Sequence, residues 1–206
     1  MQTLKKTFSK NHNEIVLLGN DNFKNILVIG VFHGDEPQGK FLIEQYLKEN
    51  NDTRLLFIPC LNPDGMAQNT RTNANGVDLN RNFPTQNWEL TERNEFFGGE
   101  SAGSEIETGF ITEIIEIYNP ELILTLHAPF KVVNYDGNAQ EISEKISQII
   151  NYPVEPSIGY PTPGSFGTYA GIEQKIPTIT LELDEECPVE NLTEPVHKIF
   201  RLLEEY

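Results

Sequence analysis

The chain has 206 residues, enough for one domain with a sizeable hydrophobic core. Its formal net charge of −16 disfavours nucleic acid and anionic membrane surfaces as partners, because their phosphates would be repelled. No apolar run reaches the length of about 18 residues that predicts a membrane span. The basic N-terminus lacks the apolar segment of a secretory signal, and the two cysteines, Cys60 and Cys187, are expected to be reduced. We therefore expect a cytoplasmic protein.

Apolar runs typical of strands alternate along the chain with segments of helical periodicity, which predicts an α/β domain. Strands are expected at residues 14–18, 26–31, 55–59, 122–126, 131–134 and 178–183. Helices are expected at residues 38–48, 105–118, 139–150, 166–174 and 190–205. The polar stretch 85–103 is long for a loop in a compact domain, and such loops are often functional.

The helix expected at 105–118 has a start typical of a capping box, in which Ser104 and Glu107 would satisfy free backbone N–H groups. Four apolar side chains recur in it at helical spacing, and we expect them to face the sheet: Ile106, Phe110, Ile114 and Ile117. The segment Asn62-Pro63-Asp64-Gly65 has the composition of a turn.

His33 and Glu36 stand three residues apart, directly after a predicted buried strand. Gly34 permits a turn between them, and Pro37 suits the first turn of the next helix. His127 ends another predicted strand, and ligands in open α/β sheets gather at the carboxyl ends of strands. Each residue alone is more often an ordinary polar side chain. Together, two histidines and a glutamate form a catalytic zinc set with a fourth position for water.

Two arginines, Arg71 and Arg81, lie in a stretch with little other charge. In an acidic protein such arginines are most often surface ion-pair partners. In the functional alternative, one of them grips a substrate carboxylate through its planar fork while the other stabilises a developing oxyanion. The residues alone leave both interpretations open.

Glu182 alternates with apolar neighbours on the strand expected at 178–183. A carboxylate in a core strand is costly unless it is exposed, paired or used in chemistry. Beside a zinc site it would be the general base that takes a proton from water. Three more acids follow it directly, so an ordinary acidic strand end is the alternative.

In combination, these motifs resemble those of the zinc carboxypeptidases of the carboxypeptidase A superfamily, from about residue 26 to residue 185. The shared motifs are HGDE at 33–36, NPDG at 62–65, GVDLNRNFP at 76–84, a strand ending in His127 and an apolar strand carrying Glu182. Within this superfamily the chain is most similar to the murein peptide amidases, bacterial enzymes that cut the bond between γ-D-glutamate and meso-diaminopimelate. That closer similarity rests on residues 71–84, 87–88, 103–105 and 159–167.

The resemblance implies a single catalytic domain over residues 1–206, with a mixed, mostly parallel central sheet flanked by helices. It implies one zinc ion per chain, bound by His33, Glu36 and His127. Glu182 would be the general base and then the acid that protonates the leaving amine. Arg71 would polarise the scissile carbonyl.

The resemblance also implies the residues that bind substrate. Asn80 and Arg81 would hold the carboxylate of the leaving residue. Tyr160 is the candidate for the mobile active-site tyrosine of the family, with Tyr169 as the competing candidate. Asp78 would support a zinc-bound histidine from behind. Three hydroxyl side chains are candidates for the wall that meets the second amino acid head of diaminopimelate: Thr162, Ser165 and Thr168.

The resulting hypothesis is a zinc-dependent hydrolase that acts on a small murein peptide during cell-wall recycling. One alternative is a metallocarboxypeptidase on other peptides, which the short chain and the tight spacing between Arg71 and Asn80 disfavour. Another is an aspartoacylase-like N-acyl amino acid deacylase; such enzymes usually carry a C-terminal β-rich domain, whereas only one helical pattern follows Glu186 here. A catalytically dead peptide-binding member would lack a ligand, Glu182 or Arg81, and all are present.

Overall fold

The computed structural model describes residues 1–20, 22–23, 25–156 and 162–206. Its strands are β1 (Gln2–Phe8), β2 (Glu14–Gly19), β3 (Ile26–Gly30), β4 (Leu56–Ile58), β5 (Leu122–His127), β6 (Val132–Asp136), β7 (Val154–Glu155) and β8 (Thr178–Glu182). Its helices are α1 (Gln38–Glu49), α2 (Pro63–Gln68), α3 (Ile106–Tyr118), α4 (Gln140–Ile150) and α5 (Val189–Glu205), with a 3₁₀ turn η1 (Leu79–Arg81) and a π-helical segment η2 (Gly167–Glu173).

The strands form one eight-stranded sheet in the order β1-β2-β4-β3-β5-β8-β6-β7. The four central strands β4, β3, β5 and β8 are mutually parallel, whereas β1 and β2 pair antiparallel with their neighbours, and β6 pairs antiparallel with β8 but parallel with β7. Because the central strands share one direction, their carboxyl ends meet at one edge of the sheet, where open α/β folds bind ligands. The mixed, mostly parallel sheet expected from the sequence is confirmed.

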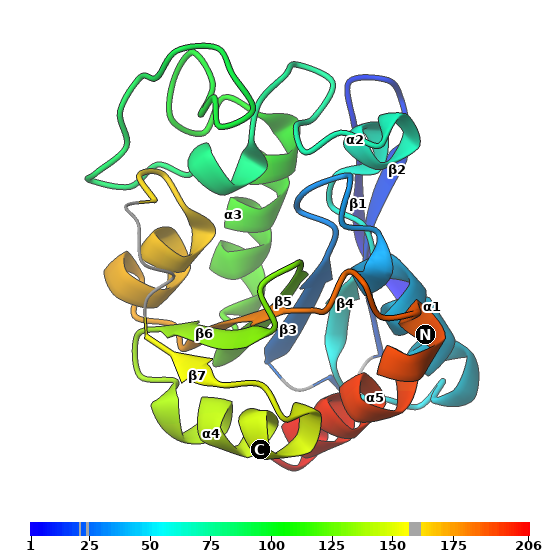
Figure 1. Ribbon diagram of the computed structural model, residues 1–206. Helices are drawn as coiled ribbons and strands as arrows, with labels where there is room; N and C mark the ends of the chain where they lie inside the picture. Colours follow the sequence, from blue (N-terminus) through cyan, green and yellow to red (C-terminus); the bar gives the residue numbers. More distant parts are fainter. Residues whose placement is uncertain (21, 24, 157–161) are drawn as a thin grey trace.

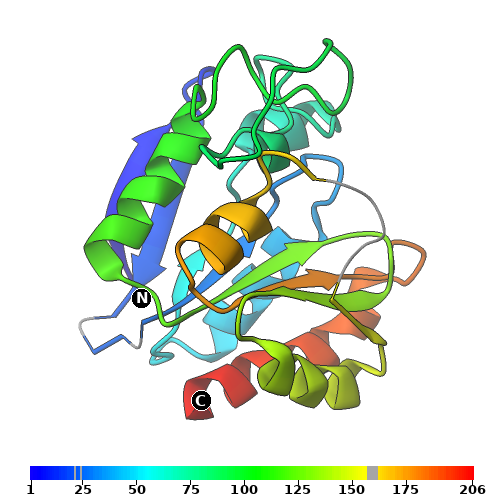
Figure 2. The ribbon, with the colours of Figure 1, turned by 90° about the vertical axis from the view of Figure 1, so that its left-hand side faces the viewer.

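Helices cover both faces of the sheet (Figures 1 and 2). Alternate residues of β3 face opposite sides, so Ile26 and Val28 pack with α1, α4 and α5, whereas Leu27 and Ile29 pack with α3 and η2. The central strands are buried on both sides, which explains why they appear in the sequence as nearly continuous apolar runs. Among the described helices, none has the length and apolar character needed to cross a bilayer.

Three local expectations were wrong. The NPDG segment starts helix α2, because the Asn62 side chain caps it by accepting a hydrogen bond from the Gly65 N–H at 2.9 Å. The capping box does not form at α3, whose cap residue is Glu105 and makes no side-chain capping bond. Ile106 and Ile117, expected to face the sheet, are exposed, since the buried stripe of α3 comprises Phe110, Ile111, Ile114 and Ile115.

The turn between β1 and β2 is fastened to helix α2 by the buried carboxylate of Asp64. Ser9 Oγ and Asn13 Nδ2 each donate a 2.7 Å hydrogen bond to Asp64 Oδ1, and the Asn11 N–H donates to Oδ2 at 3.1 Å. Burial works against the charge, but these hydrogen bonds lower the pKa of Asp64. The carboxylate therefore stabilises this junction only while it is ionised.

We expect Asp64→Asn to lower the free energy of unfolding at pH 7 by about 1.5–3 kcal/mol, because an amide cannot accept all three hydrogen bonds. The pKa of Asp64 is lower in the folded than in the unfolded chain. Its contribution is thus fully present above the unfolded value of about 3.9 and is lost as pH falls through the folded value.

The measurement is urea unfolding of zinc-free wild type and variant, from pH 7 down to the lowest pH at which both remain folded. The stability difference should shrink in acid. Asp52→Asn, in an exposed turn, is the control and should change stability little. A difference that does not vary with pH would contradict the role of the Asp64 charge.

Candidate metal centre and active site

Three side chains converge at the carboxyl edge of the parallel strands. His33 follows β3, Glu36 lies just before α1, and His127 is the last residue of β5. All three are buried, and one ligand atom from each can be chosen so that all lie within 4.8 Å of one another. The structure thus brings together the three residues that the sequence predicts as metal ligands.

The chain between β3 and His33 is held in an unusual conformation. Val31 has φ 56°, a left-handed value that a β-branched residue rarely adopts. The Asn62 N–H donates to the Val31 carbonyl at 2.9 Å, and the Asn62 side chain donates to the Phe32 carbonyl at 3.2 Å. Gly34 is needed for close approach, because a Cβ there would lie 2.0 Å from the Gly65 carbonyl carbon. The NPDG segment therefore supports the HGDE turn from behind.

The Glu36 carboxylate lies between the two imidazoles. Its Oε1 is 2.7 Å from His33 Nδ1 and its Oε2 is 3.0 Å from His127 Nδ1. The second ring nitrogen of His33, Nε2, is 3.1 Å from Asp78 Oδ1, which fixes the orientation of the ring. Both Nδ1 atoms and one carboxylate therefore face a common point, the N₂O donor set that suits a catalytic zinc ion with an open position. The residues present fit such an ion.

The protonation states of these three side chains are close to those that metal binding requires. Burial works against a charge on His33, but Glu36 and Asp78 outweigh it and raise the pKa of His33 to about 9. Burial also opposes the charge of Glu36, yet His33 and His127 lower the pKa of that carboxyl to about 2. Burial lowers the pKa of His127. Glu36 is thus anionic and His127 neutral, and only His33 must lose a proton to bind a metal.

Arg71 is held beside this cluster by two partners. Its Nε and Nη2 both lie 2.9 Å from Asp78 Oδ2, and its Nη1 is 3.9 Å from Glu36 Oε1. The ring of Phe96 lies under the guanidinium, with 5.2 Å between the ring centroid and Cζ. Phe96 belongs to the 85–103 loop, so this predicted functional loop contacts the site through an aromatic residue.

Asn80 and Arg81 lie on η1, directly after Asp78. Asn80 Oδ1 accepts a 2.9 Å hydrogen bond from the Phe166 N–H, and Arg81 Nη1 donates to the Asn80 carbonyl at 2.7 Å. Arg81 is only 7% exposed, and within the described ranges of the chain it forms no ion pair. The charge of Asp78 acts on Arg81, but no carboxylate of the described residues pairs directly with its guanidinium, an arrangement that suits a bound anion.

Glu182 is the last residue of β8, and it lies opposite His127 in the strand register. Its side chain is buried, and Oε2 has no hydrogen-bond partner among the described residues. Burial, together with the charge of Glu36, raises the pKa of Glu182 to about 8, although the Phe130 N–H donates to the carboxylate and opposes this shift. The structure therefore places an unsatisfied carboxylate oxygen beside the candidate metal ligands.

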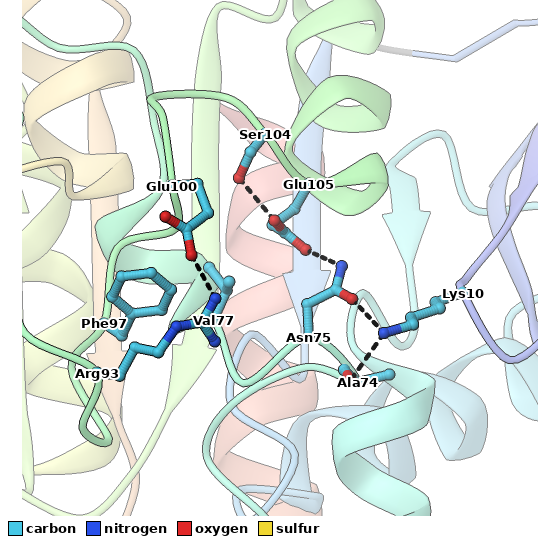
Figure 3. A pocket seen from close by; sticks show the side chains of 9 residues that line it. All are labelled: Lys10, Ala74, Asn75, Val77, Arg93, Phe97, Glu100, Ser104 and Glu105. Atoms are coloured by element: carbon cyan, nitrogen blue, oxygen red, sulfur yellow. Dashed lines mark hydrogen bonds and ion pairs between the residues drawn. The ribbon is translucent and has the colours of Figure 1, made fainter. Parts of the chain in front are cut away.

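The loop that leads to Asp78 is braced by Glu105, beside a cavity of about 360 Å³ (Figure 3). Glu105 Oε1 accepts from Ser104 Oγ at 2.6 Å, and Oε2 accepts 2.7 Å hydrogen bonds from the side-chain amides of Asn73 and Asn75. Ser104 and Glu107, the two residues of the expected capping box, belong instead to this polar cluster, since Asn73 Nδ2 also donates to Glu107 Oε2 at 3.3 Å. It fixes the residues that precede Asp78.

Asn82 is a further site-supporting residue that the sequence analysis missed. Its Nδ2 donates to the Gly98 and Ser101 carbonyls, and its Oδ1 accepts from the Glu105 N–H and from Thr108 Oγ1. It therefore ties the segment after Arg81 to the 85–103 loop and to the start of α3. The sequence offered one clue to its role, because Asn82 is the last residue of the motif DLNRN and stands two residues after Asn80.

Of the two candidate tyrosines, Tyr160 lies outside the described residues. Tyr169, the competing candidate, is on η2, where its buried ring lies 5.5 Å from that of Phe83 in the core. The hydroxyl residues proposed for the substrate wall contact one another, since Ser165 Oγ is 3.3 Å from Thr162 Oγ1 and 2.9 Å from Thr168 Oγ1.

Comparisons with known proteins agree with this geometry. Residues 2–153 match the family model described as zinc carboxypeptidase. Murein peptide amidase A of Vibrio campbellii is 34% identical over 184 residues, which cover 79% of this chain and 70% of that protein. Murein peptide amidase A of Escherichia coli K12 is 34% identical over 157 residues, and this match covers 69% of the chain but only 64% of that protein.

Solved structures extend the similarity to the whole fold. The murein-tripeptide amidase of Escherichia coli O157 superposes with a TM-score of 0.85 at 27% identity, covering 97% of this chain and 90% of that one. Thrombin activatable fibrinolysis inhibitor shares the fold, with a TM-score of 0.77 at 15% identity and coverage of 98% of this chain and 70% of its own. The family match, together with the convergent histidines and glutamate, establishes that this chain belongs to the zinc carboxypeptidases, a family of hydrolytic enzymes.

Proposed function

We propose that this chain is a zinc-dependent amidase, a single catalytic domain over residues 1–206, that hydrolyses the γ-D-Glu–meso-diaminopimelate bond of small murein peptides. Its similarity to two murein peptide amidases supports this substrate class. We further propose that it acts in the cytoplasm on recycled fragments, in agreement with its two free cysteines. Cell fractionation would test the location.

The proposal depends on one observation: the site combines the candidate metal ligands with a buried cation. Arg81, buried and without an ion pair in the described part of the chain, suits a carboxylate on the leaving residue. The bond to be cut would then lie between this anchor and the cluster formed by His33, Glu36 and His127. An amide next to a free carboxylate satisfies both parts of the site.

One zinc ion per chain, held by His33, Glu36 and His127, would supply a Lewis acid that acidifies water and polarises a carbonyl. Glu182 takes a proton from the attacking water as its oxygen bonds to the carbonyl carbon. The same carboxyl then gives that proton to the leaving amine as the C–N bond breaks. Arg71, oriented by Asp78, donates to the carbonyl oxygen as negative charge develops on it.

The substrate is tested by incubating zinc-loaded protein with L-Ala-γ-D-Glu-meso-diaminopimelate, an ordinary peptide with a free C-terminus, and N-acetyl-aspartate. Mass spectrometry of the products identifies the bond that is cut. Faster release of diaminopimelate than of an ordinary C-terminal residue supports the proposal. Faster trimming of ordinary peptides would leave the family intact but overturn the specificity, and cleavage of N-acetyl-aspartate alone would favour a deacylase.

We expect Glu182→Gln to keep the bound zinc but to lose about 10²–10⁴-fold in turnover, because the attacking water then lacks a proton acceptor. Zinc content by atomic absorption and turnover of the tripeptide are measured on the same sample. His127→Ala is the matched variant and should lose zinc as well as activity. Near-normal turnover of a zinc-loaded Glu182→Gln protein would show that Glu182 is only an acidic strand end.

We expect Arg81→Ala to weaken transition-state binding by about 2–5 kcal/mol for substrates with a free carboxylate, the cost of removing one member of a desolvated charged pair. Amidated substrates should lose much less. Arg81→Lys keeps the charge without the planar fork and should recover only part of the preference. If the ratio of kcat/KM between free-acid and amidated substrates is the same in wild type and Arg81→Ala, the anchor lies elsewhere.

A further inference from the structure

The sheet carries a row of polar side chains that starts at Glu182 and faces the segment η2. Leu181 on β8 and Val133 on β6 belong to the core formed with α4 and α5, so the alternate residues of both strands face the opposite side. That side carries Glu182 and Thr180 on β8 and Asp136 on β6. The segment η2 packs against these two strands (Figure 1). The polar row therefore runs from the proposed general base along the floor beneath η2.

Solvent reaches this row in the middle of the sheet. Thr180 is half-buried, although its strand is paired on both sides, with β5 and with β6. Its neighbours on the other face, Ile179 and Leu181, are fully covered, as is usual for an interior strand. Thr125 Oγ1 on β5 donates to Thr180 Oγ1 at 3.3 Å, so hydroxyl groups continue the row toward β5. A ligand can therefore contact this floor.

Asp136 ends β6 and lies at the far end of the row. Its side chain is half-buried, and its carboxylate forms no hydrogen bond or ion pair with any described residue. Burial raises the pKa of Asp136, and no neighbouring charge or donor of the described chain opposes this shift. A desolvated carboxylate without a partner is costly, so the position suits a cation that a ligand supplies.

Two glycines of η2 make room for this carboxylate. A Cβ on Gly167 would lie 2.1 Å from Asp136 Oδ2, and one on Gly171 would lie 2.3 Å from Asp136 Cβ. Gly167 directly follows Phe166, whose N–H donates to Asn80 in the proposed substrate anchor. The unpaired carboxylate therefore lies beside the segment that supports the anchor of the leaving residue.

The spacing along the sheet fits one length of ligand. Glu182 pairs with Val132 in the register of β8 and β6. Asp136 pairs with Thr178, four residues earlier on β8, so the two acids are offset by about 13 Å along the strands. In diaminopimelate, six bonds of about 1.5 Å separate the scissile nitrogen from the side-chain amine, a reach of roughly 7–8 Å. A hydrogen bond of about 3 Å at each end completes the distance.

We propose that Asp136 is a specificity-determining residue that binds the side-chain ammonium of the leaving residue, six bonds from the scissile nitrogen. The assignment rests on the proposed function, because it places the scissile nitrogen at Glu182 and the adjacent carboxylate at Arg81. It leaves the hydroxyls of Ser165 and Thr168 for the second carboxylate of diaminopimelate. The carboxylate of Asp136 then selects leaving residues that carry a terminal amine.

Turnover tests the assignment with two substrates that differ only in this amine, L-Ala-γ-D-Glu joined to meso-diaminopimelate or to L-2-aminopimelate. With zinc-loaded wild type we expect kcat/KM to be about 10–100-fold higher for the diaminopimelate substrate, mainly through KM, because a hydrogen bond between charged groups is otherwise lost. Asp136→Asn keeps the shape of the side chain, and the two substrates should then differ by about twofold or less. The control Glu155→Gln removes an exposed charge from the neighbouring strand β7 and should keep the full preference.

A binding measurement separates failure of this assignment from failure of the proposed reaction. Calorimetry of the zinc-loaded protein with free meso-diaminopimelate and free L-2-aminopimelate needs no turnover. Tighter binding of diaminopimelate by wild type and by Glu155→Gln, but not by Asp136→Asn, supports the assignment even if the tripeptide is not cleaved. Equal or absent binding of both compounds by wild type, or a preference that persists in Asp136→Asn, would overturn it even if the tripeptide is cleaved.

Discussion

The carboxylate of Asp78, fully buried, connects the parts of the site on which the proposed chemistry depends. One oxygen contacts His33 Nε2 and accepts the N–H of Asn80, and the other binds two nitrogens of Arg71. Burial opposes its ionisation, but His33 and the arginines hold the pKa of Asp78 below its usual range. A single charge therefore orients a candidate metal ligand, the proposed carbonyl-polarising arginine and the start of the proposed substrate anchor.

This arrangement explains why so few residues determine the site. Arg71, Asp78, Asn80 and Arg81 lie within one segment that contains only the short turn η1. Such a segment cannot hold its shape alone, and it is fixed by Glu105 on one side and by Asn82 on the other. The rigidity of the site thus comes from buried side-chain amides and carboxylates rather than from a regular element.

The sequence predicts those parts of the fold whose residues form apolar runs or stand at a fixed spacing from such runs. The central strands are buried on both faces and stand out as apolar runs, and His33, Glu36, His127 and Glu182 each follow or end such a run. Strand β1 was missed because it lies at the edge of the sheet and carries two lysines, so its residues are mostly exposed or half-buried. Its partner β2 alternates buried and half-buried residues, and it was predicted.

Local capping and helix faces could not be predicted, because tertiary contacts decided them. Ser104 and Glu107 have the right spacing for a cap, but Ser104 donates to its neighbour Glu105, and Glu107 accepts from Asn73 across the loop. Gly34 lies in the expected turn, but the sequence did not show that its small size is also needed for contact with Gly65. A cavity beside the candidate metal ligands could not be predicted either, since Phe96, Phe130 and Glu185, which line it, come from separate loops that only the folded chain brings together.

The position of the candidate metal ligands at the ends of neighbouring parallel strands has a consequence for how the protein folds. Glu36 and His127 are 91 residues apart in sequence, and Glu182 comes from a third strand beside β5. Contacts between such distant segments form late, because the entropy of closing long loops must first be overcome. Ion capture by the full set of ligands must therefore follow pairing of β3 with β5. A nascent chain that ends before residue 127 has no such set, so it cannot trap metal prematurely.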